Sequence, residues 1–253
     1  EREMIVHWLW LAHRPGLTDF MKAELLQHFS DPEDIYFAQP EAFAHIEGFT
    51  KEMAQALADK DLTAAEKNLA DAMKYKLHIL TYRDVAYPRR LKAIADPPLV
   101  LYYKGTLPDF DNSPVIGVVG TRKCTPYGLS AAKKLGHEIA ACGGTLVSGL
   151  AEGIDAMAMK SALSAGGRVV GILGCGAEQV YPKKNQWLFA DMERYGCILS
   201  GNTGFRLQLP QAQPDHQRPF LRRAGGGGPQ GKRFPPYGPS GAGAGQGCVR
   251  GAG

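Results

Sequence analysis

Four short apolar runs alternate with amphipathic segments between Val115 and Ser200. The runs are rich in Val, Ile and Leu and predict strands at 115–120, 145–148, 169–173 and 197–199. The segments between them predict helices at 127–142, 153–165 and 185–195. Strands that alternate with helices of this length build a parallel sheet with right-handed crossovers. We therefore expect an α/β fold with a Rossmann-like parallel sheet over 76–200.

Two further patterns describe how this sheet is packed. The run RVVGIL is apolar throughout, which suits a strand that is buried on both faces. Helical spacing over 127–142 predicts a buried face that consists of Leu129, Ala132, Leu135 and Ile139. Two short β-type runs, at 78–82 and 99–103, precede the sheet and are expected to bridge it to the N-terminal region.

Residues 1–75 show helical periodicity, which predicts a small helical domain. One apolar stripe predicts a helix over 17–29 that ends at Asp31-Pro32; its members are Phe20, Met21, Ala23, Leu25 and Leu26. The segment 46–57 has a turn at Gly48 and a helix cap at Thr50, and it resembles a helix-hairpin-helix (SAM-like) unit, a module that grips the DNA backbone. Because Thr50 replaces the usual second turn glycine, an ordinary capped helix pair in a packing domain is the favoured alternative.

The character of the chain changes after Ser200. Fourteen of the 31 glycines fall in 201–253, and no strand or helix periodicity continues there. Such a composition predicts disorder. This segment also carries seven of the 29 basic residues against one of the 25 acidic ones, which leaves 22 basic and 24 acidic residues in the body. The formal charge of +4 therefore comes from the tail, and a nucleic-acid site in the body must be a local patch.

The strand ends carry the candidate chemistry. The carboxyl ends of parallel strands meet at one edge of a sheet, and helices that begin there present amides and a positive dipole end to anions. Glycines allow close approach of a ligand, and an arginine matches phosphate oxygens with its fork of donors. We predict a phosphate-binding surface made of Gly120, Thr121, Arg122, Tyr127, Gly128, Ser148, Gly149, Gly153, Lys183 and Lys184.

Each of these residues has an ordinary alternative. Arg122 could form a salt bridge with Glu152 or Asp155, although its position after a strand end favours phosphate. Gly153 could serve tight packing between strand and helix. Asp155 is expected to cap or orient a loop, because a bare carboxylate repels phosphate. Tyr127 could stack on a base, but core packing is the commoner fate of such a residue.

The remaining candidates are less distinctive. Lys183 and Lys184 either extend a basic track or form a solvated pair, and the two readings are equally supported. Cys175 stands between two glycines with no histidine nearby in sequence, so we expect it to be a small packing residue. The five cysteines form no C-x-x-C pair, so neither a zinc site nor a disulfide framework is predicted, and no metal or cofactor is expected. No signal peptide or membrane-spanning run is present, which makes the cytoplasm the expected location.

Four motifs stand in order along this region: GTRKCTPYG, SGLAEGID, GG-R-VVGILGCG and YPKKN. Together they resemble the DNA-processing protein A family (DprA, also called Smf) over residues 87–200, and more loosely over the N-terminal helices. The resemblance implies an extended Rossmann-like domain that binds single-stranded DNA, loads the RecA recombinase and protects incoming DNA during natural transformation. It also implies a homodimer and no catalytic activity. Met159 stands where the family usually has a histidine, and we expect that position to serve packing.

The sequence departs from the family after Ser200. Family members continue with a motif like FPKRNRIISGLS, a strand that ends in a glutamate, and a GSG turn, none of which 201–253 contains. Codons for Asn202 onward can be chosen so that a one-base shift yields such a continuation. We hypothesise that 201–253 is the product of a one-base slip near 200–202, which the nucleotide sequence would test. A genuine basic tail that binds nucleic acid is the alternative.

A lost continuation would have a physical cost. It should supply further strands and helices of the same sheet, so the strand around Val115 or its neighbour would expose an edge and an apolar face. We expect a marginally stable or aggregation-prone chain with impaired recombinase loading.

An enzyme on the same fold is the competing hypothesis. The lysine-decarboxylase-like phosphoribohydrolases cleave nucleoside monophosphates and use a PGG-x-GT-x-x-E loop, which this sequence does not contain. A nicotinamide dehydrogenase would need G-x-G-x-x-G after its first strand, and this is also missing. No pair of acid and base residues stands at a recognisable spacing, so no catalytic residue is predicted.

Overall fold

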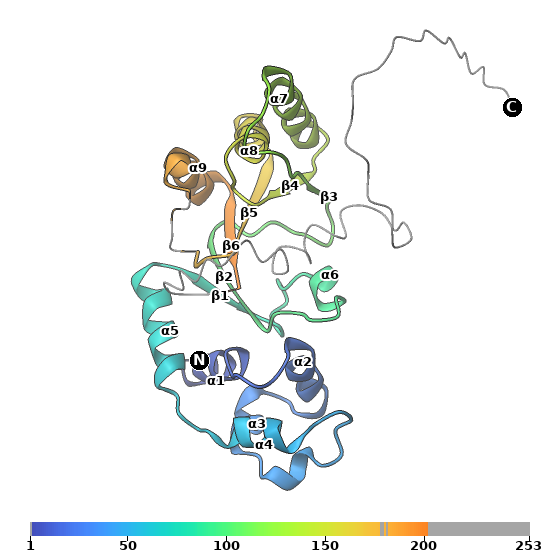
Figure 1. Ribbon diagram of the computed structural model, residues 1–253, viewed down its shortest axis with the longest axis vertical. Helices are drawn as coiled ribbons and strands as arrows, with labels where there is room; N and C mark the ends of the chain where they lie inside the picture. The colour runs from blue at the N-terminus through green and yellow to red at the C-terminus, as the bar shows by residue number, and fades with distance from the viewer. Residues whose placement is uncertain (1, 178–179, 181, 202–253) are drawn as a thin grey trace, which may run out of the picture.

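A six-stranded sheet organises the structure, a computed structural model that describes residues 2–177, 180 and 182–201 (Figure 1). The strand order is β1-β2-β6-β5-β4-β3. The strands are β1 (His78–Thr81), β2 (Val100–Gly105), β3 (Val115–Gly117), β4 (Thr145–Ser148), β5 (Arg168–Leu173) and β6 (Cys197–Ser200). The predicted disordered tail lies outside the described residues, apart from Gly201.

The helices fall into an N-terminal group and a group that crosses over the sheet. The first group is α1 (Arg2–Ala12), α2 (Asp19–His28), α3 (Pro32–Phe37), η1 (Pro40–Phe43), α4 (Lys51–Ala58) and α5 (Thr63–Lys74). A short α6 (Arg89–Lys92) lies between β1 and β2. The crossover group is α7 (Pro126–Ala141), α8 (Ile154–Ser164), the turn η2 (Lys183–Asn185) and α9 (Gln186–Tyr195).

The sheet is mixed, with a parallel half and an antiparallel half. Strands β3, β4, β5 and β6 are parallel neighbours, as the alternation of strands and helices predicted. Strands β1 and β2, which were expected only to bridge two domains, instead join the same sheet. Strand β2 pairs antiparallel with β6, with Tyr103 opposite Leu199, and β1 pairs antiparallel with β2. Pairing β2 with β6 satisfies the backbone groups of a strand that would otherwise be an edge.

The two faces of the sheet are covered by different parts of the chain. Helices α7, α8 and α9 lie together on one face (Figure 1), where Leu146, Val169 and Ile198 belong to the larger core. On the opposite face, Tyr87 and Phe110 from the segment between β1 and β3 belong to a second core. Burial on both faces explains why the parallel strands are continuously apolar.

The buried face of α7 differs from the predicted one. Ala132 and Ile139 are buried, and Leu129 is half-buried, but Leu135 is 53% exposed. Gly136 takes the buried position instead, because a Cβ there would lie 2.2 Å from the carbonyl oxygen of Ala158 in α8. The two helix backbones approach so closely that only glycine fits, which a count of apolar side chains does not detect.

Strand β3 is shorter than predicted and forms the edge of the sheet among the described strands. It ends at Gly117, although the amide of Val118 still donates to the carbonyl of Val147 on β4. Ile116 and Val119 remain exposed at this edge, where an exposed apolar edge was expected. The consequence for stability remains a prediction.

The helix cap predicted at Thr50 is confirmed, and Thr18, which the sequence analysis did not select, caps α2 in the same way. Thr18 and Thr50 accept hydrogen bonds from the third residues of α2 and α4. The stripe over 17–29 is buried except for Phe20, which is exposed. The ring of Phe43 stacks on that of Phe49 beside the turn at Gly48, which has a φ of +76°. These contacts are those of a packed helix pair, and the domain boundary at 75 stays a prediction.

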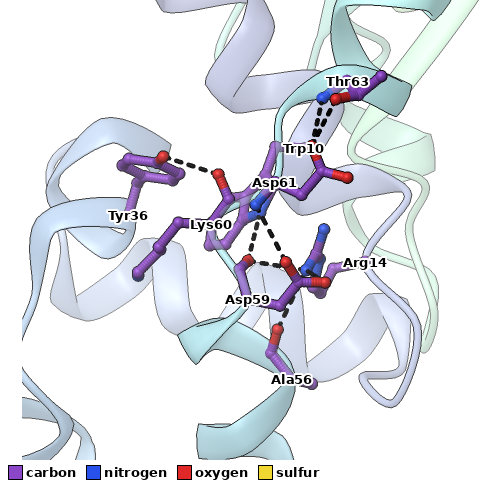
Figure 2. A network of polar contacts seen from close by, with 8 residues as sticks. All are labelled: Trp10, Arg14, Tyr36, Ala56, Asp59, Lys60, Asp61 and Thr63. Atoms are coloured by element: carbon purple, nitrogen blue, oxygen red, sulfur yellow. Dashed lines mark hydrogen bonds and ion pairs between the residues drawn. The ribbon is translucent and has the colours of Figure 1, made fainter.

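Figure 2 shows the polar network that fixes the end of α4 against α1. The Arg14 guanidinium, which is buried, donates to the carbonyls of Ala56 (3.3 Å) and Asp59 (2.8 Å). The indole of Trp10 donates to the same Asp59 carbonyl at 3.1 Å, and the Tyr36 hydroxyl donates to the carbonyl of Lys60 at 2.8 Å. Carbonyls at the end of α4 and in the segment directly after it, which lack partners within the helix, are thereby satisfied.

Removal of this guanidinium should destabilise the fold. We expect Arg14→Ala to lower the free energy of unfolding by about 2 kcal/mol, because two carbonyls lose a charged donor. Asp59→Ala is the matched control. Its carboxylate also pairs with Arg14, at 2.8 Å, but is largely exposed, so its loss should leave the urea midpoint nearly unchanged. Equal effects of the two substitutions would show that the ion pair, and not the capping of α4, carries the stability.

Candidate nucleic-acid interface

The glycine-containing loops after β3 and β4 lie against each other. The two strands are parallel neighbours, and the amide of Ile154 donates to the carbonyl of Thr121 at 3.3 Å. The first corner, residues 118–125, therefore contacts the second corner, residues 148–154. Their convergence at the carboxyl edge of the sheet is the arrangement that the sequence predicted.

A single carboxylate joins the two corners. Asp155, on the first turn of α8, is only 3% exposed. One of its oxygens accepts the amide of Gly120 at 2.9 Å, and the other accepts the amide of Gly149 at 3.3 Å. The expected role of Asp155 in orienting a loop is confirmed. The same bonds mean that these two glycine amides are already used and are not free for a phosphate.

The glycines serve packing between the corners. A Cβ on Gly120 would lie 2.4 Å from the Cβ of Ile154, and one on Gly153 would lie 2.4 Å from the carbonyl oxygen of Thr121. Gly153 also has a φ of +88°, which side chains rarely adopt. Close backbone contact, the alternative considered for Gly153, is therefore what the structure shows at both positions.

Three other predicted residues have local partners. The Ser148 hydroxyl is buried and donates to the carbonyl of Val118 at 2.7 Å, so it links β4 to the first corner instead of facing a ligand. The Thr121 hydroxyl exchanges hydrogen bonds with the backbone of Lys123. The amide of Gly128 donates to the side chain of Thr125, which caps α7. These interactions shape the loops and do not offer free donors.

Arg122 differs from the residues around it. Its side chain is exposed, and it forms no hydrogen bond or ion pair with any residue that the structure describes. Neither alternative partner is used: Asp155 is held by two amides, and Glu152 pairs with Lys184 at 3.4 Å. The main-chain amides of Thr121 and Arg122 also donate to no acceptor in the described part of the chain. The first corner therefore presents a cation and unpaired donors together.

Core packing, the alternative considered for Tyr127, is not what the structure shows. Tyr127 lies on the first turn of α7, beside the first corner, and its side chain is 83% exposed. An exposed ring at the start of this helix is a suitable platform for an unpaired base. Lys123, which the sequence reasoning did not select, is exposed in the same loop and adds a second positive charge.

The third loop reaches the second corner through a buried amide. The Asn185 side chain donates to the carbonyl of Leu150 at 2.8 Å, and the ion pair of Lys184 with Glu152 lies beside it. Lys183 is exposed on the same turn. Both lysines thus belong to the carboxyl edge of the sheet. Sequence reasoning missed Asn185, although its place directly before a helix was a usable signal.

Leu150 adopts a strained backbone at the second corner. Its φ is +57°, a left-handed conformation that is uncommon for a branched side chain. The side chain is fully buried against Gly171 of β5, where a Cβ would lie 2.2 Å from a Leu150 methyl group. The burial of the Leu150 side chain thus stabilises the strained backbone of this loop. Met159, at the position where a histidine is usual, is also fully buried, as a packing residue would be.

The described residues contain no group of three or more His, Cys, Asp or Glu side chains placed to hold a metal ion. Cys175 is half-buried against the core, and its carbonyl accepts a hydrogen bond from the Ser200 hydroxyl. No helix in the described part of the chain combines the length and the apolar character needed to cross a membrane.

Comparison with known proteins identifies the family. The family model of DNA recombination-mediator protein A matches residues 78–223, which is more than half of the chain. The chain belongs to this family. The match continues past Ser200, where the resemblance was expected to end, into residues that the structure does not describe.

Similar proteins of the DNA recombination-mediator protein A family come from several bacteria. Protein Smf of Synechocystis is 35% identical over 198 residues, which are 77% of this chain and 50% of that protein. DNA processing protein DprA of Bacillus subtilis is 40% identical over 114 residues, 45% of this chain and 38% of that protein. The chain thus spans half or less of the length of these relatives.

A solved structure shows the same fold. The X-ray structure of DNA processing protein A from Streptococcus pneumoniae aligns with a TM-score of 0.68 and 26% identity, over 85% of this chain and 74% of that one. The predicted α/β class with a preceding helical region is therefore confirmed for this member of the DNA recombination-mediator protein A family.

Proposed function

We propose that this chain binds single-stranded DNA along the carboxyl edge of its sheet. The observation that carries the proposal is the state of Arg122, an exposed guanidinium with no ion-pair partner among the described residues. Asp155 locks the loop that carries it to the second corner. A guanidinium on a fixed loop binds phosphate oxygens through two donors, and its planar fork limits the freedom lost for each hydrogen bond.

Single strands suit this surface better than duplexes. Tyr127 is exposed on the first turn of α7, the helix that follows the loop of Arg122, and aromatic rings contribute to binding when they stack on unpaired bases. The positive charge is local, since the body of the chain is slightly acidic overall. The description of the family as recombination mediators, and of its relatives as DNA processing proteins, supports DNA as the polyanion.

The wider role is part of the same proposal. We infer that the bound strand is delivered to the RecA recombinase during DNA uptake, that the protein acts in the cytoplasm, and that intact family members work as homodimers. The resemblance of the four motifs supports this role. Because 201–253 lacks the strand and turn motifs with which family members continue the Rossmann-like domain, we expect recombinase loading by this chain to be impaired.

We further propose that the protein acts without catalysis. Asp155 is buried, and each of its oxygens accepts a backbone amide of one corner, so both oxygens serve the loops. Glu152, a second carboxylate in the second corner, forms an ion pair with Lys184. General base catalysis needs a carboxylate within reach of the reacting proton. The competing phosphoribohydrolase activity predicts hydrolysis of a nucleoside monophosphate, which a direct assay would reveal.

Substitution of Arg122 tests the proposal. Arg122→Ala should weaken binding to labelled (dT)20 about tenfold, and it should reduce the dependence of log affinity on log salt by about 0.7, the value for one phosphate contact on a single strand. Fluorescence anisotropy at several salt concentrations measures both quantities. Lys134→Ala on the outer face of α7 is the matched control, because this lysine is also exposed but pairs with Glu138 one turn away.

The outcomes separate the two functions. Lys134→Ala should bind as the unsubstituted chain does. Binding that is insensitive to Arg122→Ala would reject the proposed site, and hydrolysis of a nucleoside monophosphate without DNA binding would favour the enzyme.

A further inference from the structure

The first turn of α9 carries a tryptophan that the sheet core does not use. Trp187 is 43% exposed, whereas Trp8 and Trp10 are buried in the N-terminal helices. The buried face of α9 consists of Leu188, Phe189 and Met192, so Trp187 lies on the other side of the helix. Tryptophan is highly buried on average, although it is rarely buried completely.

The indole is held in position by a neighbouring helix. The Lys160 ammonium group, on α8, lies 4.9 Å from the centroid of the Trp187 ring. A cation at this distance is attracted to the face of the ring and restricts its rotation. Since Trp187 stays exposed despite this contact, part of the ring is available to a ligand. The pair combines a positive charge with an aromatic surface, as sites for single-stranded nucleic acid do.

The segment directly before Trp187 is fastened to the second corner. The Asn185 side chain donates to the Leu150 carbonyl, and Lys184 pairs with Glu152. Trp187 follows these two residues on the same turn and cannot move independently of the proposed phosphate surface. Its position relative to that surface is therefore fixed by buried and charged contacts.

The order of strands places Trp187 and Tyr127 at opposite ends of the surface. Strand β4 lies between β3 and β5, and α8 packs against both α7 and α9 (Figure 1). Packed helices are about 8–10 Å apart, so the first turns of α7 and α9 are separated by about 20 Å. This span suits a few nucleotides, near the lower limit of about four that single-strand sites occupy.

We propose that Trp187, supported by Lys160, stacks on an unpaired base, so that the bound strand runs across the sheet edge from α9 to α7. The proposal rests on the proposed function and extends it to a second aromatic platform. The ligand is a single strand with accessible bases, whose phosphates lie over the loops of Arg122 and Lys183. A duplex, whose bases are already stacked, would not engage the indole.

Intrinsic fluorescence of the full chain provides the test. Titration with (dT)20 should quench the emission of Trp187, because a stacked thymine contacts the ring directly, and a matched duplex should not quench it. Trp187→Phe should abolish the quenching and retain most of the affinity, since phenylalanine can still stack. Trp187→Ala should weaken binding by anisotropy about tenfold. Lys160→Ala should reduce the quenching without removing the binding.

A second aromatic on the same helix is the control. Tyr195, at the far end of α9, is 64% exposed and lies under Arg194 as Trp187 lies under Lys160. Tyr195→Ala should leave affinity and quenching unchanged, because the far end of the helix is away from the carboxyl edge. Circular dichroism spectra of all variants should match that of the unsubstituted chain.

Failure of this inference is distinct from failure of the proposed function. If (dT)20 binds with an affinity that depends on Arg122, but neither quenches Trp187 nor responds to Trp187→Ala, then the stacking platform is refuted and the phosphate surface stands. If (dT)20 does not bind at all, the proposed function fails and this inference fails with it.

Discussion

Replacement of Asp155 by alanine is expected to lower the free energy of unfolding by about 3 kcal/mol, because it leaves two amides without an acceptor in a buried setting. Those amides belong to Gly120 and Gly149, one from each corner. The loops should separate, and the affinity for (dT)20 should fall at least as far as it does for Arg122→Ala. Urea denaturation and anisotropy measure the two effects on the same protein.

An isosteric substitution refines this test. Asp155→Asn retains one carbonyl acceptor but directs an NH₂ group at the second amide, so we expect an intermediate loss of stability. Asp191→Asn, at an exposed position on α9, removes a negative charge without disturbing a buried contact and should be neutral. Wild-type stability of Asp155→Asn would show that the corners are held by their packing alone.

Alanine at position 153 is expected to have an effect of similar size. The backbone of Gly153 has a φ of +88°, and an added Cβ would lie 2.4 Å from the Thr121 carbonyl oxygen and 3.0 Å from the Arg122 Cα. Both obstacles are backbone atoms of the first corner, which cannot rotate away. We expect Gly153→Ala to lower the free energy of unfolding by about 3 kcal/mol and to displace the loop that carries Arg122. Urea denaturation and the (dT)20 titration report the two consequences.

Substitution of two other glycines distinguishes the effect of backbone strain from that of a steric clash. Gly166 has a φ of +74° but open space around it, so Gly166→Ala should cost only about 1 kcal/mol. Gly174 has neither a positive φ nor a close neighbour, and Gly174→Ala should be nearly neutral. A graded series is expected, with Gly153 the most sensitive of the three. Equal losses at Gly153 and Gly166 would mean that backbone strain alone explains the effect.

These predictions distinguish two ways in which the interface can fail. Asp155 and Gly153 act on the geometry of the loops, so their substitution should reduce stability and binding together. The Arg122 side chain is exposed and forms no hydrogen bond or ion pair with the described residues, so its removal should reduce binding while the urea midpoint stays constant. If all three substitutions reduce affinity, but only those at Asp155 and Gly153 reduce stability, then Asp155 and Gly153 shape the loops and Arg122 contacts the ligand.

The local pattern of the sequence was sufficient to predict the strands and helices of the sheet domain, and the edge of the sheet at which the loops meet. Alternating apolar runs and helical segments predicted the four parallel strands and three crossover helices, because each element's periodicity is a property of neighbouring residues. Thr50 correctly predicted the start of a helix, because a cap hydrogen bond joins residues that are close in sequence. The placement of the corners also followed, since parallel strands put their carboxyl ends on one side.

The roles of individual residues needed the tertiary structure. Leu135 and Gly136 exchange their expected environments because α8 approaches α7 too closely for a side chain. Strands β1 and β2 join the sheet through β6, a partner about a hundred residues away in the chain. Pairing of this kind depends on distant segments, which no local window contains.

The sequence by itself determined the alternation of elements, the edge of the sheet and the presence of Arg122 after the first of the parallel strands, β3. Only the tertiary structure decided that the Gly120 and Gly149 amides belong to Asp155, that Tyr127 is exposed, and that Asn185 ties the third loop to the second corner. The physical reason is that a polar group's availability depends on which acceptor folding brings within about 3 Å of it, and sequence spacing does not fix that distance.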